Sequence, residues 1–216
     1  MKENYNYKGF DIVHTIKPRM KNIYLRIGED GLINISSPNI SKKEVYELID
    51  KKEAWIKKSL HSVAQKPQLV LGEEILFFGE TYVLDEHSQF KTLKYQCINN
   101  SQEQIKIHYQ NFYYREAYFH LEKRLAHFAT LMQLQPTEMK LRRMKRQWGN
   151  CRSNGVITFN IHLMQAPKEC IDYVVVHELA HMIHMNHSKA FHALVDTYLP
   201  QSKEKMVLLK QFSASI

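Results

Sequence analysis

The stretch from Pro167 to His192 reads PKECIDYVVVHELAHMIHMNHSKAFH, and it decides the fold of the back half of the chain. Proline suits the first turn of a helix, where its missing N–H costs no hydrogen bond. Asn186 tolerates the left-handed conformation and is expected to end this helix. A further helix is predicted over residues 189–199, with Ser188 as its cap. Apolar residues at helical spacing predict that the first helix is strongly buried: Ile171, Val174, Val175, Leu179, Met182 and Ile183.

Five of the twelve histidines fall in this stretch: His177, His181, His184, His187 and His192. Residues four apart lie on the same face of a helix, one turn apart. His177 and His181 are therefore expected to direct two imidazoles at one metal ion. Glu178 lies about 100° further round the helix, where a carboxylate can take a proton from a metal-activated water. The pattern predicts a zinc-dependent hydrolase of the zincin type with one zinc ion and Glu178 as its general base.

The third metal ligand has two candidates, because a catalytic zinc normally has three protein ligands and one open position. His184 shares a face with His177 but lies about 10 Å further along the axis, too far for one ion to be reached easily from both. His187 lies beyond the expected helix end, and its spacing is that of the metzincins. We favour His187. Cys151 could be a fourth ligand, but a thiolate would close the open position, and a small buried side chain is the favoured interpretation.

The first part of the chain is predicted to be β-rich with one long helix. Alternating apolar and polar residues predict strands over residues 10–14, 23–27 and 32–36, the last two as a hairpin. Ser41 and Glu44 have capping-box spacing, which predicts a helix from there to about Ala64. Further short strands are predicted over residues 75–78, 81–84, 93–97 and 105–109.

A long helix over residues 112–134 is expected to open the back half, where strands over 139–142 and 156–160 flank a loop at 148–151. The expected fold is α+β. A β-rich N-terminal region (residues 1–111) would precede a minimal zincin-like helical/β metallohydrolase domain (residues 112–216).

The formal net charge of +8 favours polyanionic partners such as nucleic acid or nucleotides, although a Lys-rich surface explains it equally well. The sharpest basic cluster runs from Arg142 to Arg146. The chain has no apolar run of bilayer length, no apolar stretch of a secretion signal at its start, and three widely spaced cysteines. No membrane partner and a cytoplasmic location are therefore expected.

The assembled motifs resemble the YgjP-like metallopeptidases, compact zincins related to the SprT-like proteases. The resemblance covers about residues 140 to 195. The strand-rich beginning, including Glu53-Ala54-Trp55-Ile56, is similar more loosely. It implies that His177, His181 and His187 are the zinc ligands and that Glu178 is the catalytic base. It rests on Trp148-Gly149-Asn150-Cys151, Ile157-Thr158-Phe159-Asn160, Pro167, Ile171 to His181, and Asn186-His187-Ser188-Lys189-Ala190-Phe191.

Two positions depart from the family pattern. The family usually has Ser-Cys-Ser where this chain has Asn150-Cys151-Arg152, and Trp where it has His192. Neither departure touches a ligand, but both could alter the substrate groove. Residues that could line this groove are Trp148, Asn150, Arg152, Tyr173, His184 and His192.

A peptide or protein is the expected substrate, with two alternatives. The same metal site could hydrolyse a phosphoanhydride, because Arg and Lys side chains in the 142–146 cluster can clamp phosphate oxygens. The chain could also be a nucleic-acid-associated protein whose zinc only holds the fold.

Overall fold

Alternating apolar and polar residues near the N-terminus form a four-stranded sheet in the computed structural model, which describes residues 2–28, 30–64 and 69–212. The strands are β1 (Lys2–Tyr7), β2 (Phe10–Ile16), β3 (Tyr24–Ile27) and β4 (Ile33–Ser37), in the order β1-β2-β4-β3. β1 was not predicted. The predicted hairpin is confirmed, because β3 and β4 pair antiparallel. On its other side β4 pairs parallel with β2.

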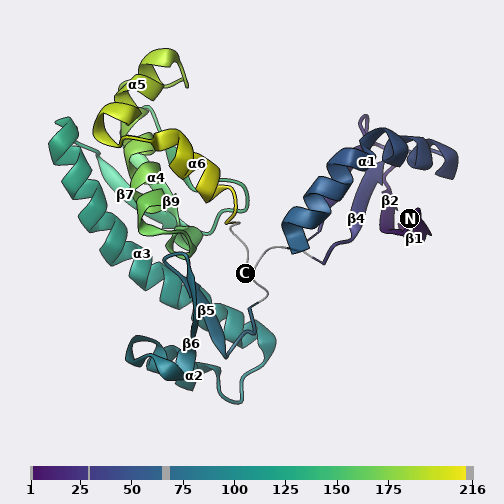
Figure 1. Ribbon diagram of the computed structural model, residues 1–216, viewed down its shortest axis with the longest axis horizontal. Helices are drawn as coiled ribbons and strands as arrows, with labels where there is room; N and C mark the ends of the chain where they lie inside the picture. Colours follow the sequence, from purple (N-terminus) through teal and green to yellow (C-terminus); the bar gives the residue numbers. More distant parts are fainter. Residues whose placement is uncertain (1, 29, 65–68, 213–216) are drawn as a thin grey trace. The chain divides into compact units, whose positions relative to one another are not determined.

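Helix α1 (Lys42–Ala64) lies against one face of this sheet (Figure 1). The predicted capping box starts it: the Glu44 N–H donates to Ser41 Oγ at 3.3 Å, and the Ser41 N–H donates to the Glu44 carboxylate at 2.8 Å. The apolar side of α1 packs on the sheet and encloses a small core. Val45, Ile49 and Ile56 come from the helix, and the sheet contributes Phe10, Ile12, Ile33 and Ile35.

The chain divides into two compact units, Met1–Lys66 and Pro67–Ile216. The division expected near residue 111 does not occur there, since that position lies inside α3 (Gln102–Met132). The fold is α+β as expected, with an N-terminal β-sheet followed by a mixed helical part. The candidate metal ligands all belong to the second unit.

The strands predicted over residues 93–97 and 105–109 are wrong, because both segments are helical. They belong to α2 (Lys91–Cys97) and α3. Ser101 and Gln104 form a capping box that starts α3. Ile105, Tyr109 and Phe112 are buried at helical spacing, which the short alternation of residues 105–109 concealed.

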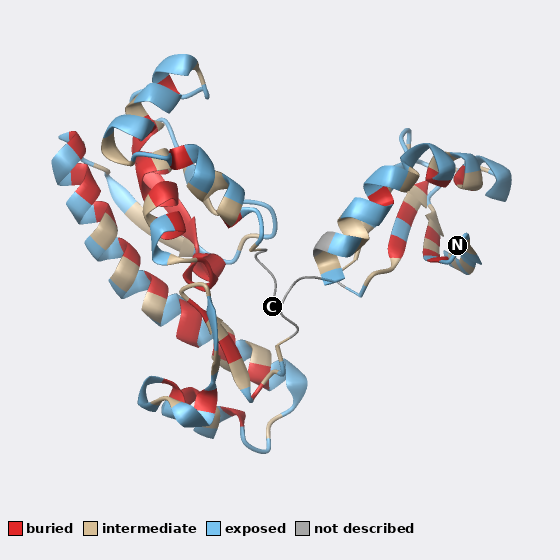
Figure 2. Ribbon diagram, in the orientation of Figure 1, coloured by how far each residue is buried: buried red, intermediate tan, exposed pale blue. Residues whose placement is uncertain are grey.

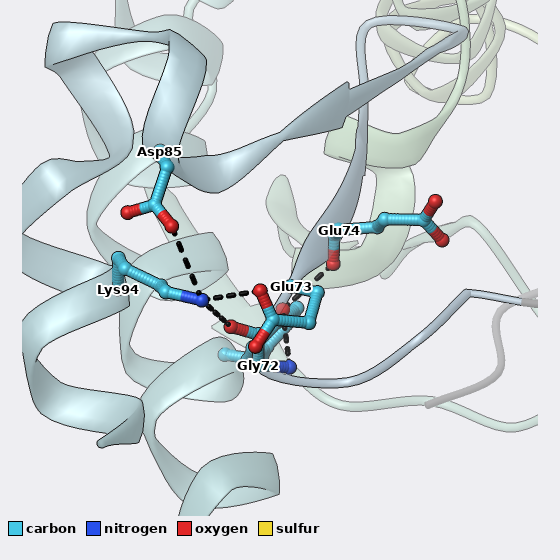
Figure 3. Close-up of polar contacts among 6 residues, drawn as sticks. Gly72, Glu73, Glu74, Asp85 and Lys94 are labelled. Carbon is cyan, nitrogen blue, oxygen red and sulfur yellow. Dashed lines mark hydrogen bonds and ion pairs between the residues drawn. The ribbon is translucent and has the colours of Figure 1, made fainter.

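These two helices hold the hairpin of β5 (Glu74–Phe77) and β6 (Glu80–Val83). The buried Tyr109 hydroxyl donates to the Glu74 carbonyl at 2.7 Å and accepts from the Gly72 N–H at 2.9 Å. Lys94 donates to the Gly72 carbonyl and forms ion pairs with Glu73 and Asp85 (Figure 3). The start of the hairpin is thereby tied to both helices.

A three-stranded sheet of β7 (Glu138–Arg142), β8 (Gly149–Cys151) and β9 (Val156–Asn160) stands beside the candidate site, in the order β7-β9-β8. β7 and β9 were predicted; β8 was predicted as a loop and is a short edge strand antiparallel to β9. Helix α4 (Lys168–Ala180) packs on α3, where Arg124 clamps Asp172 through two hydrogen bonds of 2.6 and 2.8 Å. Figure 2 shows that α4 is buried along most of its length.

The predicted end of this helix at Asn186 is wrong. Helix α4 ends at Ala180, His181 is its C-cap, and Asn186 does not adopt a positive φ. The chain turns because the N–H groups of Ile183 and His184 both donate to the Ala180 carbonyl.

Two short helices complete the described residues, α5 (Lys189–Tyr198) and α6 (Ser202–Leu209). The predicted cap of α5 is confirmed, since Ser188 Oγ accepts from the Phe191 N–H at 3.2 Å. Across the described residues, every helix is too short or too polar to cross a lipid bilayer.

Candidate metal centre

Three imidazoles converge at the end of α4. The side-chain nitrogens that His177, His181 and His187 can offer to an ion lie within 4.8 Å of one another. Nε2 of His177 lies 3.0 Å from Nε2 of His187. Two nitrogens that bind one tetrahedral zinc at about 2.0–2.1 Å are separated by about 3.4 Å. The spacing therefore fits a divalent ion after a shift of a few tenths of an ångström.

The far nitrogens of two of these rings have polar partners. Nδ1 of His181 donates to the backbone carbonyl of His184 at 3.1 Å. A carbonyl oxygen can only accept, so this bond leaves the lone pair of His181 on Nε2. The Tyr173 hydroxyl lies 3.4 Å from Nδ1 of His177. Metal-binding histidines usually have their second nitrogen held in this way, so the donor set fits a metal.

Burial keeps the rings of His177 and His181 neutral. It lowers the pKa of His177 to about 4, and the neighbouring His181, His187 and His192 act in the same direction. Burial also lowers the pKa of His181. The neutral imidazole is the form that binds a metal ion, because the ring nitrogen then carries a free lone pair.

Phe191 forms the floor of the histidine cluster. It is fully buried, and its ring centroid lies 4.9, 4.6 and 4.8 Å from those of His177, His181 and His187. Phe191 was not predicted to have a role of its own in the site. The spacing of Phe191 and Val195, both buried on one side of α5, is the signal that marks it as an inward-facing residue.

Glu178 is 5% exposed and lies against the edge strand β8. Burial raises the pKa of its carboxyl to about 8, whereas a hydrogen bond from the Cys151 N–H acts to lower it. A bound cation would also lower the pKa, because a nearby positive charge favours the carboxylate. The carboxyl thus lies beside the three imidazoles in a position with little solvent.

A cavity of about 520 Å³ contains the three histidines and Glu178. Of the expected groove residues, Trp148, Asn150 and Tyr173 line it, and Arg152, His184 and His192 do not. His184 instead supplies the carbonyl to His181, and the ring of His192 stacks on that of His187 at 6.2 Å. Residues of the wall that sequence reasoning did not single out are Gln147, Val174, Met185, Met206 and Leu209.

Cys151 lines the same cavity but is not part of the histidine cluster. Burial raises the pKa of its thiol to about 11, and Glu178 adds to this effect. A thiol that stays protonated at neutral pH is a poor metal ligand. The geometry therefore supports the interpretation of Cys151 as a small packed side chain.

Asn160 ends the motif at residues 157–160, and it was not predicted to have a role in the site. Its buried side-chain amide donates to the carbonyls of Met144 and Gln147 at 2.7 and 2.9 Å, and its oxygen accepts from the N–H groups of Met144 and His162. The bonded segment leads from β7 to β8 and carries Arg146 and Trp148 to the cavity. Asn160 thereby holds in place the segment that forms one wall of the cavity.

The comparison with protein families agrees with this geometry. Residues 21–212 match the family model described as YgjP-like, metallopeptidase domain. The chain belongs to the YgjP-like metallopeptidase family. The match covers the histidine cluster, β8, α1 and the strands β3 and β4 of the N-terminal sheet. It therefore extends beyond residues 140 to 195 and includes much of the first part of the chain, where the sequence resembled the family more loosely.

A solved structure is also similar to this YgjP-like chain, namely the crystal structure of the metallopeptidase zymogen of Pyrococcus abyssi abylysin. The two share 23% sequence identity over 42% of this chain and 93% of that chain, with a TM-score of 0.39. No curated protein matches the chain.

Proposed function

We propose that this protein is a zinc-dependent peptidase in which His177, His181 and His187 hold the metal and Glu178 is the general base. The observation that carries the proposal is the convergence of three imidazoles beside a buried carboxyl in one cavity. Its family membership supports a metal-dependent peptidase and a peptide or protein substrate.

Zinc, when bound, supplies Lewis-acid chemistry, since it increases the acidity of water and polarises a carbonyl. Glu178 then accepts the proton of the attacking water and delivers it to the leaving amine. The Cys151 N–H orients the Glu178 carboxylate for both transfers. The Tyr173 hydroxyl lies against Nδ1 of His177 and holds this ring in position.

The outer edge of β8 supports an extended peptide as the substrate. The Trp148 carbonyl and the Arg152 N–H bond to β9, so the alternation of the strand turns the backbone of Gly149 and Cys151 away from β9. No described strand pairs with this edge. An extended peptide can add to an open strand edge through main-chain hydrogen bonds, which would place its backbone beside Glu178.

The test compares Glu178→Gln with Glu169→Gln, which changes an exposed glutamate in the first turn of the same helix. Casein or a mixed peptide library serves as substrate, and bound zinc is measured by elemental analysis. We expect Glu178→Gln to lose turnover while it retains zinc, and Glu169→Gln to behave like the unaltered protein. Full activity of Glu178→Gln would remove its role as the base.

Phosphoanhydride hydrolysis is the second candidate, because Arg146 lies in the cavity wall. Nucleoside triphosphates are therefore assayed beside the peptides with the same preparations. Release of phosphate without peptide cleavage would replace the peptidase proposal. Unfolding on chelation, with no hydrolysis of either substrate class, would favour a structural zinc.

A further inference from the structure

The N-terminal unit has a second surface of interest, the side of its sheet that faces away from α1. We call this side the outer face. Apolar residues such as Ile12, Ile33 and Ile35 point to α1, so their neighbours along each strand point the other way. The pairing register arranges these neighbours in two rows across all four strands, Tyr24–Ser36–Thr15–Lys2 and Arg26–Asn34–Val13–Asn4.

Positive charge gathers at the β3 end of the outer face. Four cations lie within ten residues, Lys17, Arg19, Lys21 and Arg26, and the sequence has no Asp or Glu from residue 12 to residue 28. None of the four forms an ion pair with a described residue. Asp11 lies on the far side of the face, where Asn6 donates to its carboxylate at 2.9 Å. Asp30 lies at the charged end, where its carboxylate occupies the space that a Cβ at Gly28 would take.

A cavity of about 480 Å³ opens on this charged end. Lys17 and Arg26 line it together with Tyr24, Asn34 and Ser36. Tyr24 is 48% exposed. The Asn34 amide donates to the Leu32 carbonyl at 3.2 Å, which leaves its side-chain oxygen free to accept a hydrogen bond. The cavity thus combines two cations, an exposed aromatic ring and small hydrogen-bonding groups.

We propose that the outer face binds single-stranded nucleic acid, with phosphates at Lys17 and Arg26 and one base stacked on Tyr24. Phosphates bind to Lys and Arg without regard to sequence, and aromatic rings on a flat surface stack on unpaired bases. The Asn34 and Ser36 side chains can bond to base edges. The bases of a duplex are already paired and stacked on one another, so only an unpaired strand can offer a base to the exposed ring of Tyr24.

The carboxylates of an acidic polypeptide would also pair with the cations, but they would gain nothing from the exposed ring of Tyr24. This binding site lies in a different unit from the histidine cluster and does not depend on peptidase activity.

The test measures binding of a labelled oligothymidylate of about 12 nucleotides to the full chain by fluorescence anisotropy, across a salt series. We expect Lys17→Gln/Arg26→Gln to weaken binding at least about tenfold and to reduce the salt slope by about 1.4, since each phosphate contact contributes about 0.7 on a single strand. Tyr24→Ala should weaken binding about 5- to 100-fold with an unchanged slope, and Tyr24→Phe should restore it.

Lys51→Gln/Lys52→Gln is the matched control, because it removes the same charge from exposed positions on α1. An equal loss of affinity in this control would show that net charge alone explains the binding, and it would overturn the proposal. Equal binding of a duplex, equal competition by a glutamate-rich peptide, or no salt-dependent binding would each overturn it as well.

Discussion

Gly149 on β8 lies directly beneath the carboxyl of Glu178. A Cβ atom at position 149 would come within 2.5 Å of Glu178 Oε1 and 2.8 Å of its Cδ. These separations are shorter than any real contact, so the position requires glycine for the carboxyl to stay where it is. The requirement is steric, and it links the Trp-Gly segment of the sequence to the candidate base on α4.

Gly149→Ala should therefore displace the Glu178 carboxyl. We expect kcat to fall at least about tenfold, because forcing an extra methyl group into a packed position costs about 1–3 kcal/mol. Peptidase kinetics and zinc content are measured together, and zinc should be retained. Ser153→Ala, an exposed change two residues after β8, is the control. Unchanged kcat in Gly149→Ala would show that the carboxyl need not lie on β8.

Asn160→Ala should loosen the cavity wall between β7 and β8. The change removes the donor from the carbonyls of Met144 and Gln147, in hydrogen bonds that are partly buried. Each lost hydrogen bond costs about 0.5–1.5 kcal/mol, so thermal unfolding should show a fall in Tm, with a loss of activity. Asn154→Ala removes one weak bond, to the Val156 N–H at 3.4 Å, and should change neither. Equal effects of the two variants would contradict the role of Asn160.

Phe191→Ala should lower zinc affinity, because the three imidazoles lose the ring on which they rest. Truncating a buried Phe costs about 3–5 kcal/mol, so folding is checked by circular dichroism. Phe191→Leu retains most of the volume and should bind zinc more tightly than Phe191→Ala. Zinc affinity is measured by competition with a chelating dye. Identical affinities for the two folded variants would show that Phe191 does not organise the ligands.

Acid should destabilise the fold through His162. This buried histidine has no described partner for either ring nitrogen, and burial lowers its pKa from 6.5 to about 4, with nearby Arg143 adding to the effect. Above pH 6.5 the ring is neutral in both states. As the pH falls from 6.5 to about 4, the unfolded chain gains a proton that the folded chain resists, so stability drops by at most about 3 kcal/mol.

His162→Leu should flatten this decline in denaturant-unfolding experiments between pH 7 and 4. The decline will not vanish, because burial also lowers the pKa of His14 and of His120. At pH 7 the variant should be about as stable as the unaltered protein, since no hydrogen bond is lost. An unchanged pH dependence would show that folding does not lower the pKa of His162.

Chelation should abolish peptidase activity and leave the fold intact. Helix α4 is held by apolar packing, with Val175, Val176, Leu179 and Ala180 fully buried. The far-ultraviolet circular dichroism of the metal-free protein should match that of the zinc-loaded protein, with Tm lowered only by the loss of ligand binding. Readdition of zinc should restore activity. Collapse of the spectrum on chelation would instead assign the metal a structural role.

The parts of the fold that the sequence predicted well are those in which periodicity and caps agree. The helix that carries His177, the cap at Ser188 and the capping box at Ser41 follow from local chemistry alone. The segment 105–109 failed because five residues are too few to separate a strand from a helix. Only its burial under the hairpin, with Tyr109 bonded to Glu74, decides between them.

The candidate site shows the same limit. The spacing of the histidines predicted which rings converge, since that is a property of the helix and the following turn. It could not predict that the His184 carbonyl orients His181, or that Asn160 and Gly149 shape the wall around Glu178. The first depends on how the chain turns after Ala180. The relationships of Asn160 and Gly149 join segments far apart in the chain, and β8 pairs with β9 between them.

The three imidazoles are not equally accessible, since His177 and His181 are half-buried whereas His187 is exposed on the segment before α5. In the proposed zinc site, two ligands would therefore be held in place by the surrounding protein, and the third would close the site from the solvent side. The rate at which such a site exchanges its metal would then depend chiefly on the one exposed ligand, His187.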